Sequence, residues 1–420
     1  MSNSTDGKRW ARAYPELGTG PVAIEPCISR EYFELERERV FKRAWLNVGR
    51  VEEIPQVGDF LVRDLAVCQT SIVVARGRDG QIRGFHNMCS HRGNKLVWDS
   101  KGNCRRMTCK FHGWTYDTAG KLVGVPDEAN FFDLNKAEHG LTPVATDVWQ
   151  GFIFINVDPN PKETLHEFLG EVVEQLKGYP FDKFAFGYGY KGNLECNWKI
   201  AVDSQQEGYH APYLHRRTLG DICIIPGNPF MHALDIKFFG PHRMLSLPGN
   251  MAHAPSASEA LAHRFGWSIK REDLGFLDRN NLPKGINPRR DPNWLFDIYL
   301  IFPNFWLAPF NGAFQTHNFW PISHDRMYQE IKMYVIPPRT AGEHFSVEFA
   351  KCVNRDTWLE DFSTLENTQQ VLGSGAKKHF ILQDEEVCLR HFYKILGQWT
   401  GGPASASNSS EASAIAERNA

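Results

Sequence analysis

The chain has 420 residues, of which 42% are hydrophobic and 23% charged, with a formal net charge of −2. At about 150 residues per domain, this length predicts two or three domains. The small net charge provides no global basic field for nucleic acid or an anionic membrane. Nine cysteines at irregular spacings do not form a secreted disulfide framework, and no apolar run reaches the roughly 18 residues of a membrane span.

The N-terminal residues 1–14 are polar and lack the apolar stretch of a signal peptide. Together with the absence of a disulfide framework, this predicts a cytoplasmic protein with reduced thiols. We expect neither a membrane nor a nucleic acid among its partners.

The first part of the chain changes from a helical pattern to a β pattern. In residues 30–45 apolar positions recur three and four residues apart, which predicts an amphipathic helix. From Trp45 to Asp158, short runs of β-branched and aromatic residues alternate with glycine, aspartate and asparagine turns, which predicts a small all-β domain. The clearest strand-like runs are 60–63, 71–75 and 151–157.

The segment Pro159-Asn160-Pro161 predicts a domain boundary. The elements expected after it are helices at 163–177, 198–215, 356–372 and 383–397, and strands at 186–195, 297–308, 313–320 and 326–336. Residues 220–292, rich in glycine, proline, asparagine and histidine, predict a long irregular loop of functional importance. The tail after Trp399 has few apolar residues, which predicts disorder.

Two short clips, each with one cysteine and one histidine, lie at turns between strand-like runs. They read Cys-Ser-His at 89–91 and Cys-Lys-Phe-His at 109–112, and 17 residues separate them. Two thiolates and two imidazoles suit a structural zinc site. They equally suit a Rieske [2Fe–2S] centre, in which two cysteines hold one iron and two histidines hold the other. Two unrelated pairs are the third interpretation.

The spacing within the clips favours iron over zinc. Zinc fingers usually pair cysteine with cysteine and histidine with histidine, whereas each clip here mixes the two, so it can send one ligand to each iron. Gly93 and Gly113 allow backbone amides to approach the sulfurs. Residues 87–117 resemble the Rieske fingerprint, and Cys104, which has no clip partner, is expected not to bind. The expected cluster ligands are Cys89, His91, Cys109 and His112.

A Rieske centre moves one electron at a time, and residues 159–420 remain beyond the predicted β domain. His210 and His215, five residues apart, are weak evidence of a metal site by themselves. However, residues 197–210 resemble the catalytic motif of Rieske-type ring-hydroxylating oxygenases, in their large (alpha) subunit. The resemblance extends over residues 40–399 and is strong at both metal motifs. It implies that the two histidines bind a mononuclear Fe(II).

Two histidines and one carboxylate on one face of the iron leave positions open for O2 and substrate. The family carries this carboxylate on an acidic helix near the C-terminus, and Asp361 matches its position here. Glu360, Asp356 and Glu366 are alternatives, and a solvated acidic helix face is the non-functional interpretation. The expected cofactors are therefore one [2Fe–2S] cluster and one mononuclear Fe(II) per subunit.

The resemblance implies an α+β fold with two domains. We expect a small all-β Rieske [2Fe–2S] domain and a larger catalytic domain whose antiparallel sheet is flanked by helices, in a helix-grip or START-like arrangement. The expected division is an N-terminal segment at 1–44 packing on the catalytic domain, the Rieske domain at 45–158, the catalytic mononuclear-iron domain at 159–399 and a disordered tail at 400–420.

The resemblance also implies a terminal oxygenase component. Because no Gly-x-Gly-x-x-Gly fingerprint for flavin or NAD is present, its electrons must come from a ferredoxin or a flavin reductase. The expected reaction is dihydroxylation, monohydroxylation or oxidative demethylation of a small aromatic or polar organic substrate, as in aromatic hydrocarbon catabolism. A Rieske electron-transfer protein with a non-catalytic second domain and a zinc-stabilised interaction module are the alternatives.

Relatives of this kind are trimers, either homotrimers or α3β3 assemblies with a small beta subunit. In them an acidic residue joins an iron-bound histidine to a cluster histidine of the neighbouring subunit. By position, Glu207 is expected to join His210 to His112 of the partner subunit. Glutamate replaces the usual aspartate there, as in a minority branch that acts on carnitine-like substrates, and this weakens the case for ring dihydroxylation.

Side chains of the substrate pocket are expected from the catalytic domain. The candidates are Asp203, Ser204, Phe302, Phe305, Trp306 and Phe319. For each of them plain core is the favoured interpretation, and a pocket position is the alternative. The polar run 203–206 before Glu207 favours a substrate with a polar or charged group.

Overall fold

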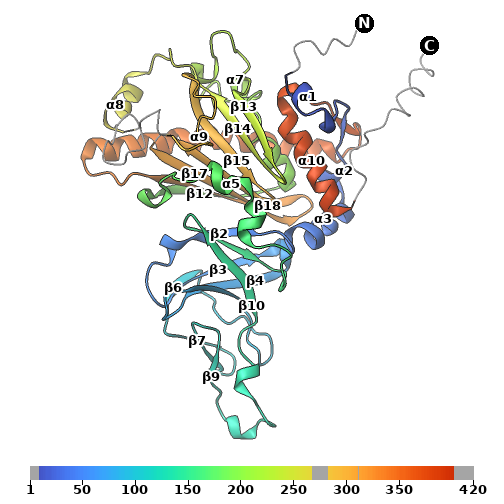
Figure 1. Cartoon of the computed structure of the whole chain (residues 1–420), viewed down its shortest axis with the longest axis vertical. Coiled ribbons are helices and arrows are strands. Elements are labelled where there is room, and N and C mark those ends of the chain that lie inside the picture. Colours follow the sequence, from blue (N-terminus) through green and yellow to red (C-terminus); the bar gives the residue numbers. More distant parts are fainter. Residues whose placement is uncertain (1–8, 267–281, 311, 402–420) are drawn as a thin grey trace, which may run out of the picture.

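The computed structural model describes residues 9–266, 282–310 and 312–401. Two β-rich bodies lie one above the other, and the larger one carries most of the helices (Figure 1). Residues 402–420 of the predicted tail and part of the predicted loop at 220–292 lie outside the described residues.

The smaller body is built from two antiparallel sheets. Its seven-stranded sheet has the order β2-β11-β10-β5-β4-β3-β6, and its three-stranded sheet has the order β7-β8-β9. The strands are β2 (Leu46–Arg50), β3 (Asp59–Leu65), β4 (Thr70–Arg76), β5 (Ile82–His86), β6 (Lys101–Asn103), β7 (Arg106–Thr108), β8 (Thr115–Asp117), β9 (Leu122–Gly124), β10 (Pro143–Trp149) and β11 (Phe152–Asn156). These strands agree with the all-β pattern that the sequence predicts for this segment.

The larger body contains a second seven-stranded antiparallel sheet, in the order β12-β18-β17-β16-β15-β14-β13. Its strands are β12 (Ala185–Leu194), β13 (Asp235–Phe239), β14 (His242–Pro248), β15 (Trp294–Ile301), β16 (Phe305–Phe310), β17 (Ala313–Ser323) and β18 (Arg326–Val335). Its helices are α4 (Leu165–Leu169), α5 (Glu171–Gln175), α6 (Trp198–Asp203), α7 (Ala211–Leu214), α8 (Ala257–Phe265), α9 (Ala341–Leu372) and α10 (Val387–Thr400). The predicted α+β class with an antiparallel catalytic sheet is confirmed.

Strand β17 is buried on both faces along most of its length. Successive side chains of a strand point to opposite faces of the sheet. On one face Phe314 contacts the ring of Phe152 at a 5.9 Å centroid separation, and the Asn318 side-chain amide donates to the Asn47 carbonyl oxygen at 3.2 Å, so this face packs on the smaller body. Gln315 and His317 point to the other face, toward α9.

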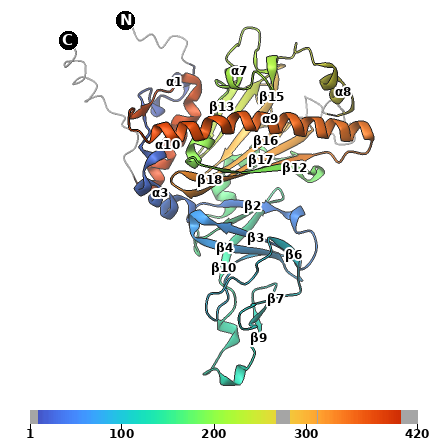
Figure 2. The same ribbon diagram turned by 180° about the vertical axis from the view of Figure 1, so that it is seen from behind.

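Helix α9 crosses that other face of the larger sheet (Figure 2). Thr340 and Glu343 form a capping box at its start, and the helix therefore begins well before the predicted residue 356. The buried positions on this helix are Ser346, Thr357, Asp361 and Leu365. The last three are spaced four residues apart, so they form one stripe that faces the sheet.

Two sequence-based expectations in the larger body are wrong. The predicted irregular segment at 220–292 contains the hairpin β13–β14 and helix α8. Strand β14 is buried at every position, so it lacks the polar alternation that marks a strand in sequence. The predicted helix at 198–215 is interrupted between α6 and α7, because Pro212, in the first turn of α7, has no N–H to donate to the Gly208 carbonyl oxygen as a continuous helix would require.

The N-terminal segment packs on the larger body. It contains α1 (Arg9–Ala13), β1 (Val22–Ala23), α2 (Glu25–Ile28) and α3 (Arg30–Glu36), followed by a π-helical turn at Arg37–Phe41, and β1 pairs with β19 (His379–Phe380). At the end of α3, Glu36 forms a fully buried ion pair with Lys199 of α6 (2.8 Å) and accepts a hydrogen bond from the Trp198 indole (3.0 Å). Among the described residues, no helix is long and apolar enough to cross a membrane.

Replacement of Lys199 by methionine should destabilise the protein. The substitution leaves Glu36 without its cationic partner in a dry environment, which typically costs about 3–5 kcal/mol. We expect this loss in the free energy of unfolding by urea, whereas Lys177→Met, at a surface pair that is 72% exposed on the lysine side, should change it by less than about 1 kcal/mol. Equal effects of the two substitutions would contradict a structural role for the buried pair.

Candidate metal centres

The two cysteine–histidine clips have the same backbone geometry. In each loop the cysteine amide donates to the carbonyl oxygen five residues later, at 2.9 Å for Cys89 and 2.8 Å for Cys109. The amides of Gly93 and Gly113 return to the carbonyl oxygens of the same cysteines at 2.9 and 3.0 Å. Both glycines have positive φ (74° and 75°), a conformation that favours glycine. The tight loops place both thiols and both imidazoles at one end of the smaller body.

The two cysteines of the clips are buried, whereas His91 is half-buried and His112 is exposed. Cys89 and Cys109 are each 2% exposed, and the rings of His91 and His112 lie 4.6 Å apart between centroids. The Nδ1 atom of His91 is buried without a hydrogen-bond partner among the described residues. An imidazole nitrogen left unpaired in a buried site is what metal coordination would satisfy, so the donor set fits a cluster.

Hydrogen-bond donors surround the two sulfurs. The Tyr116 hydroxyl lies 3.4 Å from the Cys89 sulfur, and the Asn94 side-chain amide donates to the Cys109 sulfur at 3.6 Å. Backbone amides of Phe111 and His112 also donate to the Cys109 sulfur. Such donors stabilise anionic sulfur and tune the potential of a cluster.

Cys104 lies apart from the two clips. Its amide donates to the Gly58 carbonyl oxygen at 2.9 Å, next to the edge strand β6, and its side chain packs against the core of the smaller body. This position agrees with the expectation that Cys104 does not bind the cluster.

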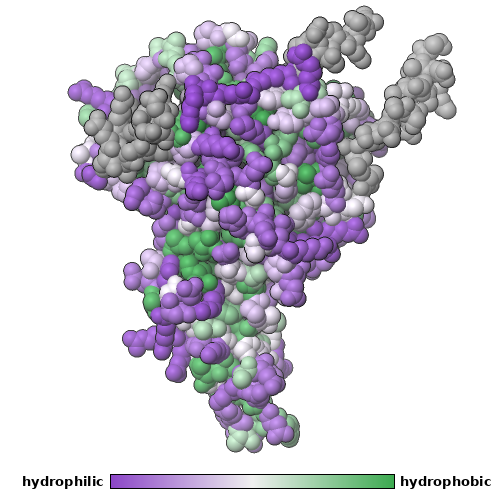
Figure 3. Space-filling view, in the orientation of Figure 1, coloured by the Kyte–Doolittle hydropathy of each residue, from purple (hydrophilic) through white to green (hydrophobic). Residues whose placement is uncertain are grey.

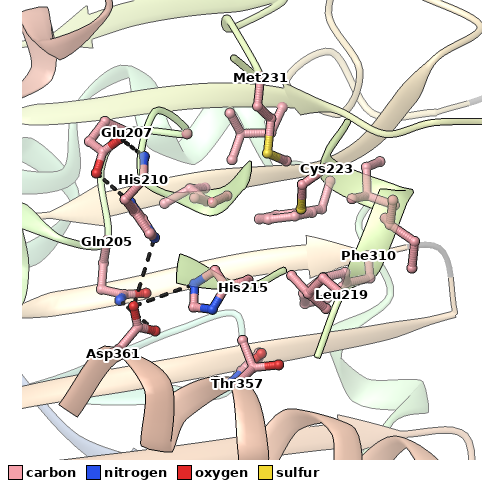
Figure 4. Close-up of a pocket in the computed structure, with 18 of the residues that line it drawn as sticks. Gln205, Glu207, His210, His215, Leu219, Cys223, Met231, Phe310, Thr357 and Asp361 are labelled. Atoms are coloured by element: carbon pink, nitrogen blue, oxygen red, sulfur yellow. Dashed lines mark hydrogen bonds and ion pairs between the residues drawn. The ribbon is translucent and has the colours of Figure 1, made fainter. Parts of the chain in front are cut away.

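His210, His215 and Asp361 form a second group of metal-binding type in the larger body (Figure 4). One ligand atom from each residue lies within 4.8 Å of the others. Asp361 Oδ1 is 3.7 Å from His210 Nε2 and 3.4 Å from His215 Nε2, and it has no hydrogen-bond partner among the described residues. Two imidazoles and one carboxylate that converge in this way fit the facial set of a non-haem iron site.

A second carboxylate contacts the outer nitrogen of each imidazole. His210 Nδ1 hydrogen-bonds to Glu207, whose other oxygen accepts from the His210 amide at 3.1 Å. His215 Nδ1 hydrogen-bonds to Glu360 at 3.0 Å, and Glu360 also accepts from the Thr218 hydroxyl at 2.7 Å. These contacts fix the proton on Nδ1 and direct both Nε2 lone pairs toward Asp361, as in metal-binding histidines generally.

The charges around His210 favour a cation. Burial alone would lower the pKa of this imidazole, but the carboxylates of Glu207 and Asp361 raise it to about 9. The site therefore holds excess negative charge, and a divalent cation can replace the proton that this charge attracts.

The interrupted helix positions these side chains. Asn197 caps α6 by accepting from the Lys199 amide at 3.0 Å, and α6 ends at Asp203. The chain then turns through Gly208 and restarts as α7, so Glu207 and His210 leave the turn while His215 follows the last residue of α7. Helix α9 supplies Asp361, from its buried stripe, and the adjacent Glu360 from the opposite side.

The three alternative carboxylates on α9 do not face the Nε2 atoms of the two histidines. Glu360 contacts the outer nitrogen of His215, Asp356 pairs with the exposed Arg355 at 2.8 Å, and Glu366 accepts from the Glu195 amide at 3.0 Å. Asp361 is therefore the carboxylate of this helix that faces both Nε2 atoms.

A cavity of about 420 Å³ extends from the metal-binding group between α9 and the sheet. Figure 4 shows Leu219 and Phe310 on the far side of this cavity from Glu207 and Asp361. Its walls are mainly aromatic and aliphatic, with few polar groups. They include Leu219, Ile222, Met231, Phe296, Trp306, Phe310, Gln315, Asn354 and Trp358.

Some of the predicted pocket residues line the cavity and others do not. Ser204 and Trp306 are in its wall. Phe302, Phe305 and Phe319 are instead core residues that are at most 3% exposed.

The polar run 203–206 also divides between the cavity and the interior of the protein. Ser204 and Gln205 line the cavity, whereas Asp203 accepts hydrogen bonds from Tyr393 (2.6 Å) and Gln206 (3.0 Å). Gln206 in turn accepts from Arg243. Asp203 and Gln206 therefore anchor α6 to the sheet and α10, and of the four residues behind the predicted polar or charged substrate only Ser204 and Gln205 line the cavity.

Sequence reasoning missed the polar residues at the far side of the cavity, Gln315 and Asn354. Gln315 lies within a strand pattern that was identified, and alternation along that strand places it on the same face as His317. A signal was therefore present, but the sequence alone does not show which face of a doubly buried strand borders a cavity.

Two protein families match the chain. Residues 181–402, more than half of it, match the family described as "Ring hydroxylating alpha subunit (catalytic domain)", and residues 44–144 match "Rieske [2Fe-2S] domain". The chain therefore belongs to the family of ring-hydroxylating alpha subunits and joins its catalytic domain to a Rieske domain. The two predicted cofactor classes, a [2Fe–2S] cluster and a mononuclear iron, are confirmed with it.

Curated relatives act on different kinds of molecule. The glycine betaine monooxygenase oxygenase subunit of Pseudomonas aeruginosa (strain UCBPP-PA14) is 31% identical over 187 residues, 44% of this chain and 43% of that protein. The biphenyl dioxygenase subunit alpha of Metapseudomonas furukawaii is 35% identical over 261 residues, 59% of this chain and 53% of that protein. The chain thus spans about half the length of the curated relatives it matches.

Solved structures share the fold over nearly the whole chain. Naphthalene 1,2-dioxygenase from Rhodococcus sp. bound to indole superposes with a TM-score of 0.73 at 21% identity, covering 94% of this chain and 98% of that chain. The quaternary ammonium Rieske monooxygenase CntA in complex with L-carnitine gives 0.68 at 19% identity, covering 90% and 95%. At these identities the likeness establishes the fold alone.

Glu360→Gln should weaken iron binding without removing a ligand. Loss of the carboxylate that orients His215 Nδ1–H typically lowers metal affinity by about 10–100-fold. Titration of the iron-depleted protein with Fe(II) under anaerobic conditions should show this loss, and Asp356→Asn, on the same helix but away from the histidines, should leave the affinity unchanged. An unchanged affinity in Glu360→Gln would show that Glu360 does not orient the ligand.

Proposed function

We propose that this protein is the terminal oxygenase component of a multicomponent Rieske non-haem iron oxygenase, which uses O2 and externally supplied electrons to oxygenate a small organic substrate. The observation that carries the proposal is the convergence of His210, His215 and Asp361 at one end of a cavity large enough for a substrate. Ligand cavities of proteins typically measure about 300–1,000 Å³, and this one lies within that range.

The roles of the side chains follow from the contacts. Cys89, His91, Cys109 and His112 would hold the cluster, and His210, His215 and Asp361 would hold the mononuclear iron. The proposed domains are the N-terminal segment 1–44, the Rieske domain at 45–158 and the catalytic domain at 159–399. When bound, the metals supply electron transfer and O2 activation, and the protein supplies binding, orientation and exclusion of water.

The cavity supports an aromatic or similarly apolar substrate. Its wall contains Trp294, Phe296, Trp306, Phe310 and Trp358, and no lysine or arginine is among the described residues that line it. Its carboxylates, Glu207 and Asp361, lie at the metal end, where both contact histidines. An uncharged, mainly apolar molecule would bury its surface there without leaving a charge unpaired.

An assembly in which clusters and irons of different subunits meet would complete the electron path. His112 is exposed, and next to it Phe111, Trp98 and Met88 expose 55%, 57% and 48% of their surface. Lys110 lies over the Trp98 ring at 4.5 Å. Apolar atoms also gather on this lower part of the molecule in Figure 3. Large exposed apolar side chains beside a redox centre favour a contact surface.

We infer that this surface meets the Glu207 region of a second copy, as in a trimer. Glu207 already contacts His210 through Nδ1, so a hydrogen bond to His112 of the partner subunit would join the two metal centres. A ferredoxin or flavin reductase would provide the electrons. None of the nine cysteines, all of which are described, forms a disulfide, which supports a reducing compartment such as the cytoplasm.

Asp361→Ala should abolish turnover but preserve the cluster. The substitution removes the carboxylate ligand of the mononuclear iron and leaves the Rieske loops untouched. Product analysis with a surrogate reductase and a panel of aromatic acids, amines, ethers and hydrocarbons should show no product, while the dithionite-reduced protein keeps the low average g of a histidine-ligated [2Fe–2S] cluster in EPR. The control Glu366→Gln should retain both iron and activity, and an active Asp361→Ala would place the third ligand elsewhere.

Glu207→Gln should slow electron transfer between the centres. The amide keeps an acceptor for His210 but loses the negative charge of a bridging hydrogen bond, which we expect to slow the single-turnover rate by about tenfold. Rapid-mixing measurement of cluster oxidation with bound substrate and O2 would follow this step. Glu386→Gln removes a carboxylate that lies near Glu207 without a contact to His210, and it should have the wild-type rate. An unchanged rate in Glu207→Gln would rule out the bridge.

A further inference from the structure

A chain of polar side chains leads from the wall of the cavity into the interior of the protein. His317 on β17 is fully buried, and its Nε2 lies 3.1 Å from the side-chain nitrogen of Gln315, while its Nδ1 lies 3.1 Å from that of Gln329. The imidazole lies between the indoles of Trp306 and Trp358, at centroid separations of 4.3 and 4.4 Å. Of the two amides, Gln315 is the one that lines the cavity.

The protonation of His317 determines how the two amides can be oriented. Burial holds the pKa of this imidazole well below its usual value, so the ring is neutral and has one N–H donor and one acceptor nitrogen. It therefore accepts from one amide and donates to the other, and one glutamine must present its oxygen rather than its nitrogen. Amide oxygen and nitrogen have the same shape, so the hydrogen-bond network decides between them.

The surroundings of Gln329 identify which amide presents its oxygen. The Gln329 Oε1 atom is buried without a hydrogen-bond partner among the described residues. Reversing this amide would bury unpaired N–H donors in its place, and unpaired N–H groups are rarer in proteins than undersatisfied carbonyl oxygens. Gln329 therefore donates to His317 Nδ1, His317 Nε2–H donates to the Gln315 oxygen, and the Gln315 NH2 group faces the cavity.

The charges of the lining residues indicate which kind of acceptor Gln315 can bind. No lysine or arginine is among the described lining residues, and the carboxylates of Glu207 and Asp361 lie at the metal end. An N–H donor without a cation beside it is the environment of a neutral acceptor rather than of an anion.

Strand geometry places Gln315 away from the metal ligands. His317 is next to Trp306, and the Trp306 indole donates to the Gln205 carbonyl oxygen at 3.0 Å. The Gln205 side chain in turn lies beside Asp361. Gln315 is two residues further along β17, which corresponds to about 7 Å toward the Phe310 end. A group held by Gln315 would therefore lie at the end of the substrate opposite the carbon that is oxidised.

We propose that Gln315 is a specificity-determining residue that binds a hydrogen-bond acceptor on an otherwise apolar, uncharged substrate, such as the carbonyl oxygen of an aryl ketone. This inference rests on the proposed function, because it assigns the substrate class of the same cavity. His317 is a positioning residue in this arrangement, since it acts by orienting the Gln315 amide.

A binding experiment without turnover tests the proposal. The probes are 2-acetylnaphthalene, 2-isopropenylnaphthalene, which has the same shape but no acceptor, and indole, which has a donor but no acceptor of comparable strength. Equilibrium dialysis against the metal-loaded, anaerobic protein should give a dissociation constant about tenfold lower for the ketone than for the hydrocarbon. Gln315→Leu should reduce this preference to about one, with the hydrocarbon bound as before.

Gln370→Leu is the control, because this exposed glutamine of α9 lies outside the cavity wall and does not contact His317. It should retain most of the preference for the ketone. Equal binding of the ketone and the hydrocarbon by the wild type, equal losses in the two variants, or a preference for indole over the ketone would each overturn the proposal. Because no O2 or reductant is present, this result does not depend on oxygenase activity, whose failure would appear separately as a lack of product in turnover assays.

Discussion

The catalytic half of the protein depends on two imidazoles that each lie between two carboxylates. Glu207 and Glu360 hold the outer nitrogens of His210 and His215, and Asp361 faces both inner nitrogens. In the absence of the outer pair the rings could rotate or change tautomer, and the inner nitrogens would no longer converge. The break between α6 and α7 and the buried stripe of α9 can both be understood as the backbone that this arrangement needs.

The sequence could propose the metal ligands but only part of their support. Spacing of cysteine and histidine favours a Rieske centre over a zinc finger, and the family resemblance favours Asp361 while leaving Glu360, Asp356 and Glu366 as alternatives. The role of Glu360 could not be predicted, because a helix of 32 residues with a weak apolar stripe does not reveal which of two adjacent carboxylates points inward. That choice depends on how α9 is rotated against the sheet.

Composition misled where burial was complete. The strands β13 and β14 lie in a stretch rich in glycine and proline, and a strand buried at all positions loses the alternation that sequence reasoning needs. Asp203 and Gln206, which belong to the polar run that favoured a polar or charged substrate, do not line the cavity. Their hydrogen bonds to Tyr393 and Arg243 come from elements far away in the chain, so local sequence contains no sign of them.

The two faces of β17 have separate tasks, and this has a consequence for how the family can diversify. Phe314 and Asn318 contact the Rieske domain, while Gln315 lines the cavity and His317 lies behind it against Trp358. A substitution at one of these neighbouring positions therefore acts either on the junction between the domains or on the cavity side of the strand. Substitution of every second residue on this strand can therefore change which substrates the cavity accepts and leave the packing between the two domains unchanged.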